Sequence, residues 1–339
     1  MRRRALGFAL TTISFIALGA SLVACNPGLV RAQVLRVAEL NTTRLGALDR
    51  RTTVVILPGG VLEEHGPYLP SYTDGYANER MAAELASAIA ARPGWTALVF
   101  PPMPLGVHGA NAIGGKHVFP GTYSVREPTL RAVLMDLARA LGDQGFRWIF
   151  VVNGHGGIAH NRALDDAGDY FNETYGGRMV HLLGLRPARA VDSVFESTVP
   201  PAVRMEDGFT VHADLRETSY LMALRPDLIP PSVAQAPSFT ARDFADLVRI
   251  ASQPDWPGYF GAPRHASAEL GRRLVEAHTR QYVAIALRII DGMDPRDLPR
   301  FADLRAQAPG VDRVVSGAWA RDSVEEGRQR AWLAKRGRR

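Results

Sequence analysis

The sequence predicts an α/β fold, in which helices cover both faces of a mostly parallel sheet. Short apolar runs alternate with segments of helical periodicity along the chain, an order typical of parallel strands joined by crossover helices. The strand-like runs are apolar throughout, which indicates burial on both faces of the sheet. The chain has 339 residues, 46% of them hydrophobic and 22% charged, so it is long enough for one large α/β domain or two small ones.

Four strands and five helices follow from the apolar pattern. The strands are expected at residues 52–58, 96–100, 148–153 and 178–185. The first helix is expected after Asp74, because Met81, Leu85 and Ile89 recur at helical spacing. The other helices are expected at residues 128–141, 161–173, 217–225 and 267–290. Two Pro-rich stretches, 186–211 and 230–266, are expected to form irregular loops.

The N-terminus has the pattern of a secretory signal. Basic residues at positions 2–4 precede the apolar stretch 5–20. Cys25, the only cysteine in the chain, ends a Leu-Val-Ala-Cys sequence that resembles a bacterial lipobox. This pattern predicts a signal peptide at residues 1–24 and an exported, periplasmic lipoprotein anchored through acylated Cys25. The other interpretation is simple secretion with cleavage after Ala32.

The rest of the chain is expected to divide into three parts. Residues 26–50 read as a tether, residues 51–293 as the α/β domain, and residues 294–339 as a helical, basic extension. The formal net charge is +6, but the three arginines of the signal leave on cleavage. The basic C-terminus is either a frayed, solvated end or a surface that touches anionic headgroups. The sequence lacks the interleaving of basic and aromatic residues that would indicate nucleic-acid binding.

Metal-ligand residue types follow two of the predicted strands. Glu63, His65 and Asp74 come after the first strand, and His155 comes after the third. The carboxyl ends of parallel strands meet at one edge of the sheet, so these side chains are expected to lie close together. Two imidazoles and two carboxylates suit Zn²⁺, Mn²⁺ or Fe²⁺, and a bridging carboxylate allows two ions. The alternative for Asp74 is a simple helix N-cap.

Neighbouring positions in an extended segment point in opposite directions, whereas positions two apart point the same way. Glu63 and His65 are therefore expected to face one ion or two adjacent ions. Glu64, which lies between them, is expected to point away and to be solvated at the rim of the sheet.

Four segments together resemble the creatininase (creatinine amidohydrolase) family. They are GGVLEEHGPYLPSYTD (59–74), FPGTYS (119–124), NGHGG (153–157) and HADLRETSYLMALRPDL (212–228), in the order of that family's signatures. The resemblance implies an αβα three-layer fold, often assembled as a hexamer. It also implies hydrolysis of an amide or cyclic amide C–N bond, other than a peptide bond, in a small molecule with one or two divalent metal ions, Zn, Mn or Fe.

The resemblance also implies roles for individual residues. The positions that match metal ligands are Glu63, His65, Asp74 and His155. Asp74 matches the carboxylate that bridges two ions, His212 matches a histidine proposed for proton transfer, and Glu217 matches an acid near the site. In the implied mechanism, a metal-activated water attacks the amide carbon and His212 protonates the departing nitrogen.

The sequence departs from the family pattern at several positions. Gly157 stands where true creatininases carry a glutamate that binds the second metal, so creatinine itself is in doubt as substrate, and Glu217 is a candidate to compensate. Tyr68 replaces a histidine, and Asn161 is a candidate to replace an asparagine usual at position 158. The candidates for contacting substrate or supporting the site are Tyr68, His117, Asn153 and Asn161.

Two other functions compete with the metal hydrolase. A non-catalytic lipoprotein that kept the fold as a binding module would bind little metal. A serine hydrolase would need a G-x-S-x-G nucleophile elbow, and the sequence contains none.

Overall fold

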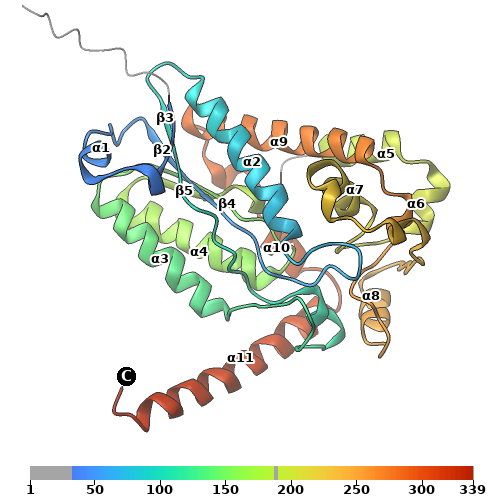
Figure 1. The fold of residues 1–339 in the computed structure, drawn as a ribbon. Coiled ribbons are helices and arrows are strands. Elements are labelled where there is room, and N and C mark those ends of the chain that lie inside the picture. Colours follow the sequence, from blue (N-terminus) through green and yellow to red (C-terminus); the bar gives the residue numbers. More distant parts are fainter. Residues whose placement is uncertain (1–32, 187–189, 339) are drawn as a thin grey trace, which may run out of the picture.

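The computed structural model describes residues 33–186 and 190–338 and contains a five-stranded parallel sheet. The strand order is β1-β3-β2-β4-β5. The strands are β1 (Gln33–Arg36), β2 (Thr53–Pro58), β3 (Thr96–Val99), β4 (Trp148–Val152) and β5 (Arg178–His181). Helices α2 and α9 cover one face and α3 and α4 cover the other (Figure 1), which confirms the predicted three-layer arrangement.

The helices lie between and after these strands. They are α1 (Thr42–Gly46), α2 (Thr73–Ala90), α3 (Glu127–Asp143), α4 (Ile158–Tyr175), α5 (Ala190–Thr198), α6 (Pro201–Asp207), α7 (Leu215–Leu224), α8 (Phe244–Ala251), α9 (Ala268–Ile290), α10 (Phe301–Ala306) and α11 (Val311–Ala334). Helix α11 extends away from the sheet beneath α3 and α4 (Figure 1).

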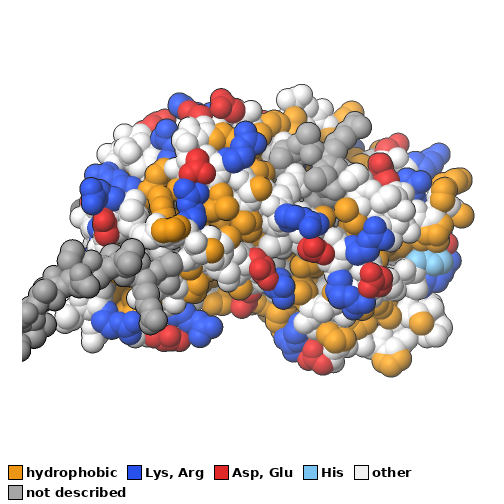
Figure 2. All heavy atoms as spheres, turned by 90° about the horizontal axis from the view of Figure 1, so that it is seen from above, with side chains coloured by type: hydrophobic (Ala, Val, Ile, Leu, Met, Phe, Trp, Pro, Cys, Tyr) orange, Lys and Arg blue, Asp and Glu red, His pale blue; other side chains and the backbone are white. Residues whose placement is uncertain are grey.

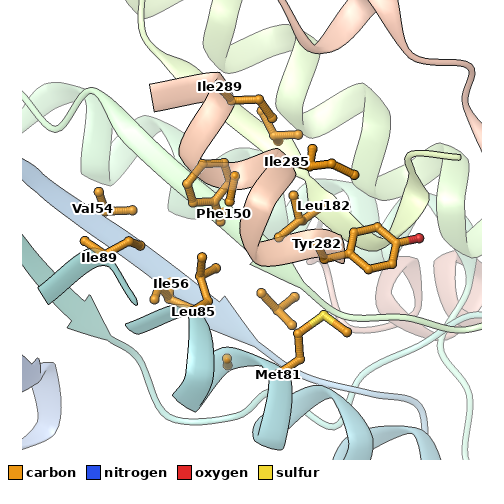
Figure 3. Close-up of a cluster of buried hydrophobic side chains, with 14 of the residues drawn as sticks. Val54, Ile56, Met81, Leu85, Ile89, Phe150, Leu182, Tyr282, Ile285 and Ile289 are labelled. Carbon is orange, nitrogen blue, oxygen red and sulfur yellow. The ribbon is translucent and has the colours of Figure 1, made fainter. Parts of the chain in front are cut away.

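Strand β2 is buried on both faces and anchors the core. Val54 and Ile56 pack with α2 and α9, whereas Val55 and Leu57 pack with α3 and α4, and all four are 0% exposed. Figure 3 shows the hydrophobic cluster on the side of α2 and α9, where Val54 and Ile56 lie near Phe150 of β4. Each fully buried side chain of this size contributes about 1.5–3 kcal/mol. The loop after β2 therefore starts from a rigid position.

The structure differs from the predicted elements in several places, among them α1, which lies in the segment assigned to a tether. Residues 33–36, assigned to a tether, form β1 beside β3. This edge strand is mostly exposed, so it depends on backbone pairing and carries no apolar run that would reveal it. The fourth strand ends at His181, where a 3₁₀ turn (Leu182–Gly184) replaces its expected second half.

The stretches expected as loops also contain α5, α6 and α8. Pro201 starts α6, a position at which proline is tolerated because its nitrogen donates to no other residue of the helix. Asp243 caps α8 by accepting a hydrogen bond from the backbone N–H of Asp246. Proline content therefore concealed short helices whose start signals were present.

The predicted signal peptide (1–24), Cys25 and residues 26–32 lie outside the described residues. Within residues 33–186 and 190–338, none of the helices is both long enough and apolar enough to cross a membrane. Export and lipidation at Cys25 therefore stay predictions from the sequence.

The surface above α2 and α9 carries mixed charges. Figure 2 shows basic and acidic side chains interspersed with hydrophobic ones over this face. Exposed ion pairs along the two helices fit this mixture, such as Arg80 with Glu84 on α2 and Arg280 with Glu276 on α9. Exposed pairs of this kind contribute less than about 1 kcal/mol each, so they affect solubility more than stability.

Candidate metal centre

The loop that follows β2 carries Glu63 into the interior. Gly60 allows this loop to pass close to α2, because a Cβ at Gly60 would lie 2.6 Å from the backbone nitrogen of Gly75. Glu63 is 1% exposed. Its Oε1 accepts the N–H of Ala110 at 2.5 Å, and its Oε2 lies 2.9 Å from Nδ1 of His155. Both oxygens are thus held at the carboxyl end of the sheet.

Asp74 lies in the first turn of α2 and faces the same cluster. Tyr72 occupies the N-cap position of this helix, so capping does not explain Asp74. Its Oδ2 lies 3.3 Å from Nδ1 of His155, and its Oδ1 lies 3.7 Å from Nε2 of His65. One carboxylate therefore faces two imidazoles, one with each oxygen.

His155 lies in the loop after β4 and is oriented by the backbone. Its Nε2 lies 2.7 Å from the carbonyl oxygen of His108, so Nε2 donates its hydrogen there and Nδ1 faces the two carboxylates. Asn161 Nδ2 donates to the carbonyl oxygens of His155 and Gly157, at 2.7 Å each. Asn161 therefore holds the His155 loop in place.

His65 and Glu217 lie on the other side of Asp74. His65 Nδ1 lies 3.1 Å from the carbonyl oxygen of Glu63, and its Nε2 lies 3.7 Å from Oε2 of Glu217. The same Glu217 oxygen accepts the N–H of Ala213 at 2.5 Å. Ala213 has a φ of +49°, which is unusual for a residue with a side chain and costs conformational energy. Such strain is common at functional sites.

Two sets of donor atoms share Asp74. One set comprises Glu63, Asp74 and His155, the other His65, Asp74 and Glu217, and the donor atoms of each set lie within 4.8 Å of one another. Among the described residues, His65 Nε2 and Asp74 Oδ2 are buried without a hydrogen-bond partner, a costly arrangement unless another group binds them. Imidazole and carboxylate donors together suit Zn²⁺, Mn²⁺ or Fe²⁺. The residues present therefore fit one or two divalent ions.

His212 lies beside both sets. Its Nε2 lies 2.6 Å from the carbonyl oxygen of Glu64, so that nitrogen donates to the backbone. Its Nδ1 lies 3.5 Å from Oε1 of Glu63, and its ring centroid is 4.2 Å from that of His65. His212 thus presents Nδ1 to the space that the candidate ligands surround.

The charges of the cluster shift its pKa values. Burial alone would raise the pKa of Glu63, but the charges of His155 and His212 lower it to about 2. Burial alone would lower the pKa of His212, but Glu63 and Glu64 raise it to about 10. Burial raises the pKa of Glu217 to about 7. These shifts follow from burial and from the opposite charges that face each other across the cluster.

Glu64 does not lie where the sequence predicted. It is 2% exposed, and its Oε2 lies 3.6 Å from Nε2 of His212 rather than in solvent. The prediction was wrong because residues 60–64 have no regular structure, so strand alternation does not set their directions.

Three residues expected near the substrate lie away from the centre. Tyr68 packs edge-on against Tyr259, with ring centroids 5.6 Å apart. Asn153 is 1% exposed, and its carbonyl oxygen lies 3.3 Å from Nε2 of His160. Neither Tyr68, Asn153 nor His117 lines the cavities at the cluster. Packing against the buried Tyr259 explains the position of Tyr68.

Two cavities meet at the cluster, and Asp74, His155 and Glu217 line both. The first cavity has a volume of about 110 Å³ and is bounded by the loop around His108 and by α11. The second has a volume of about 420 Å³ and lies between α2, α7 and α9. The cluster is therefore open to ligands from two sides.

The contribution of the C-terminal extension was not found from the sequence. Arg305 and four residues of α11 line the first cavity, although residues 294–339 were expected to be an appendage. The backbone N–H of Ala110, which binds Glu63, was also missed. No motif marks these positions, because they reach the site only through the tertiary path of the chain. His108 also lines the first cavity.

Known proteins resemble this chain over most of its length. A family model described as creatininase, creatinine amidohydrolase, matches residues 38–286. Creatinine amidohydrolase of Pseudomonas putida is 27% identical over 244 residues, which cover 69% of this chain and 88% of that protein. The mycofactocin precursor peptide peptidase of Mycobacterium tuberculosis is 28% identical over 254 residues, which cover 71% of this chain and 87% of that protein.

Solved creatininases have the same fold. The crystal structure of a creatinine amidohydrolase matches with a TM-score of 0.58 and 23% identity, over 76% of this chain and 99% of that chain. A creatininase described as the Mn form matches with a TM-score of 0.53 and 25% identity, over 75% and 98%. A mutant creatininase described as the Zn-Zn type matches with a TM-score of 0.51 and 23% identity, over 75% and 96%. Creatininases of this fold therefore exist in Mn and Zn forms.

Proposed function

This chain belongs to the creatininase family, and from that premise we propose that it is a metal-dependent hydrolase of an amide or cyclic amide C–N bond. The observation that carries the proposal is the pair of donor sets that share Asp74 at the carboxyl end of the sheet. These sets line a cavity large enough for part of a small molecule. The relatives include a peptide peptidase, so the proposed bond class includes peptide bonds.

In this proposal the two donor sets hold two ions of Zn, Mn or Fe. Glu63 and His155 would hold one, His65 and Glu217 would hold the other, and Asp74 would belong to both sets. A Cβ at Gly157 would lie 2.8 Å from Nε2 of His155, which leaves no room for a glutamate at that position in this backbone arrangement. This close approach supports Glu217 as the substitute carboxylate.

A divalent ion at this centre would lower the pKa of a bound water to about 7 and so supply a nucleophile. The chain's own residues would complete the reaction. His212 lies at the wall of the first cavity with Nδ1 toward the centre, and we assign it the protonation of the departing nitrogen. The Glu64 carbonyl oxygen, 2.6 Å from Nε2, holds the ring in that orientation.

The metal content of the purified full chain tests this proposal. We expect about two equivalents of Zn, Mn or Fe by elemental analysis, a marked decrease in His155→Ala, and hydrolysis in a screen of amides, lactams and short peptides. One equivalent in the wild type would indicate a mononuclear variant. No metal, even after reconstitution, would overturn the ligand assignment and favour a non-catalytic binding module.

We also propose that the protein is exported and anchored through Cys25, in keeping with the lipobox. Cys25→Ala should move the protein from the membrane fraction to the soluble fraction, and an unchanged distribution would contradict the anchor. Assembly as a homo-oligomer, with the hexamer of the family as the expected form, can be tested by light scattering of the detergent-solubilised chain.

A further inference from the structure

The outer wall of the first cavity comes from the C-terminal extension. This wall lies beyond residues 38–286, the part that matches the family. The residues of the extension that line the cavity are Arg305, Val311, Val314, Val315 and Ala318. The facing residues outside the metal cluster are largely apolar and include Ile113, Ile158 and Phe244. The cavity therefore presents metal ligands on one side and an apolar surface with one arginine on the other.

Side-chain contacts hold this wall in place. Trp319 Nε1 donates to Oε2 of Glu127 at 2.6 Å, and Arg126 pairs with Glu326 at 2.9 Å. Nε2 of His108 lies 3.1 Å from Oδ2 of Asp322. Since these contacts span about two turns of α11, the helix is fixed against the body rather than extended freely beside it.

Arg305 is the one Lys or Arg among the described residues that line this cavity. It is half-buried, and none of the described carboxylates forms an ion pair with it. Its guanidinium carbon lies 5.8 Å from the ring centroids of both Phe209 and Phe301. Burial, together with the charge of Arg186, lowers the pKa of Arg305, as expected for a cation that lacks an anion. The acidic residues that line the cavity, Glu63, Asp74 and Glu217, all belong to the metal cluster.

Arg300, five positions earlier, is an arginine of the same region that pairs with a carboxylate. Its two terminal nitrogens lie 2.7 Å and 2.6 Å from the two carboxylate oxygens of Asp169, a bidentate pair of the kind that guanidinium geometry favours. Arg305 lies at the other end of α10, in its last turn, and has the same chemistry, but it lines a cavity instead of facing a carboxylate. An anion that enters the cavity would give Arg305 the kind of partner that Arg300 has in Asp169.

From this arrangement we propose that Arg305 binds a carboxylate of the substrate, so that the substrate is a small amide with an anionic end and a compact apolar part. N-acyl amino acids and the C-terminal ends of short peptides belong to this class. The inference rests on the proposed hydrolase function for the position of the scissile bond, but the contact between Arg305 and the carboxylate does not pass through the metal ions.

Binding of two matched probes tests the assignment. N-acetyl-L-leucine carries a carboxylate, and N-acetyl-L-leucinamide replaces it by a neutral amide of almost the same shape. Their dissociation constants would be measured by calorimetry on the metal-loaded full chain, on Arg305→Gln and on Arg305→Lys. Arg313→Gln serves as the control, because Arg313 is an exposed arginine of the same extension. Metal content and melting temperature would be recorded for every sample.

We expect the wild type to bind the acid at least about tenfold more tightly than the amide, a difference of about 1.4 kcal/mol. This preference should vanish in Arg305→Gln, persist in part in Arg305→Lys and stay unchanged in Arg313→Gln, with equal metal content throughout. Equal binding of the two probes to the wild type, or no binding of the acid, would overturn the proposal. A preference that survives in Arg305→Gln would also overturn it, since the carboxylate would then be held by the metal centre. Failure to load metal would refute the hydrolase instead, while the comparison of the two probes on the metal-free chain would still test Arg305.

Discussion

The two cavities that meet at the metal cluster differ in origin and in chemistry. The first, of about 110 Å³, is closed by α11 and Arg305, which lie beyond the residues matched by the family. The second, of about 420 Å³, is built by α2, α7 and α9 within the matched part, and it contains more polar side chains, such as Tyr220, His278 and Gln281. The comparison teaches that the candidate metal donors lie within the part matched by the family, whereas one wall of the first cavity is supplied by the C-terminal extension.

The largest effect is expected where both cavities share a residue. Asp74→Asn removes the carboxylate common to both donor sets, so both ions should be lost and activity should fall by well over about 100-fold, since even residues behind metal ligands contribute 10–100-fold. Elemental analysis and activity of the same preparation check this. Asp312→Asn, an exposed aspartate on α11, should change neither. Retention of two ions by Asp74→Asn would contradict the bridging role.

His212→Ala should slow the reaction without removing the metal ions. If His212 protonates the departing nitrogen, its loss should reduce the rate by about 10²–10⁴-fold with metal content unchanged. His265→Ala is a suitable control, because His265 pairs with Glu206 at the surface. Loss of metal together with activity would show that His212 is a ligand.

Val314→Trp should affect the first cavity alone. The larger side chain occupies space in a cavity of about 110 Å³, so affinity for N-acetyl-L-leucine should fall by about tenfold or more with no change in metal content. Val324→Trp on the same helix is the matched control, since Val324 is 67% exposed. Equal effects of the two substitutions would mean that α11 does not close the cavity.

Asp322→Ala tests the connection between α11 and the metal centre. Asp322 pairs with His108, whose carbonyl oxygen lies 2.7 Å from Nε2 of His155 and whose φ of +50° marks a strained loop. Without Asp322 this loop should loosen, and metal affinity should fall by up to about tenfold. Metal titration of the variant and of Asp312→Ala would reveal the difference, and identical affinities would argue that α11 closes the cavity without supporting the ligands.

The smallest effect is expected at His278, which lines the second cavity, and it concerns the free energy of unfolding. Burial, aided by the charge of Arg186, lowers the pKa of His278 from 6.5 to about 4. Between these values the unfolded chain binds more protons at this residue than the folded one, so the free energy of unfolding should decrease as the pH falls from 6.5 toward 4. The slope from this residue is at most about 1.4 kcal/mol per pH unit. Denaturation of His278→Phe at several pH values should show a shallower decrease, and an unchanged slope would exclude His278 as the source.

Much of the fold could be predicted from the sequence because its signals are local. The buried strand at residues 53–58 is apolar at nearly every position, and the loops after β2 and β4 carry their donor residues close to the strand ends. Glu63, Asp74 and His155 are therefore assignable to one edge of the sheet from the sequence alone. The structure adds that Asp74 faces both His155 and His65 and that Glu217 lies beside His65. These contacts divide the donor residues into two sets that share Asp74.

The remaining features depend on tertiary packing. The burial of Glu64 follows from an irregular loop, the packing of Tyr68 from its contact with Tyr259, and the position of Arg305 at the first cavity from the way the segment with α10 and α11 packs against the site. None of these has a local sequence pattern, because the partner residues are distant along the chain. Sequence reasoning therefore located the donors of the site and missed the wall that faces them.

The carboxylate shared by the two donor sets has a thermodynamic consequence. If each oxygen of Asp74 contacts one ion, then the first ion to bind fixes the orientation of a ligand of the second and also changes the charge that the second ion meets. The two binding events are then linked, and by reciprocity each ion alters the affinity for the other by the same factor. The two sites would then respond to metal supply as a coupled pair rather than independently. Partial loading would give a mixture of metal-free, singly loaded and doubly loaded protein, and the proportions would depend on the sign of that coupling.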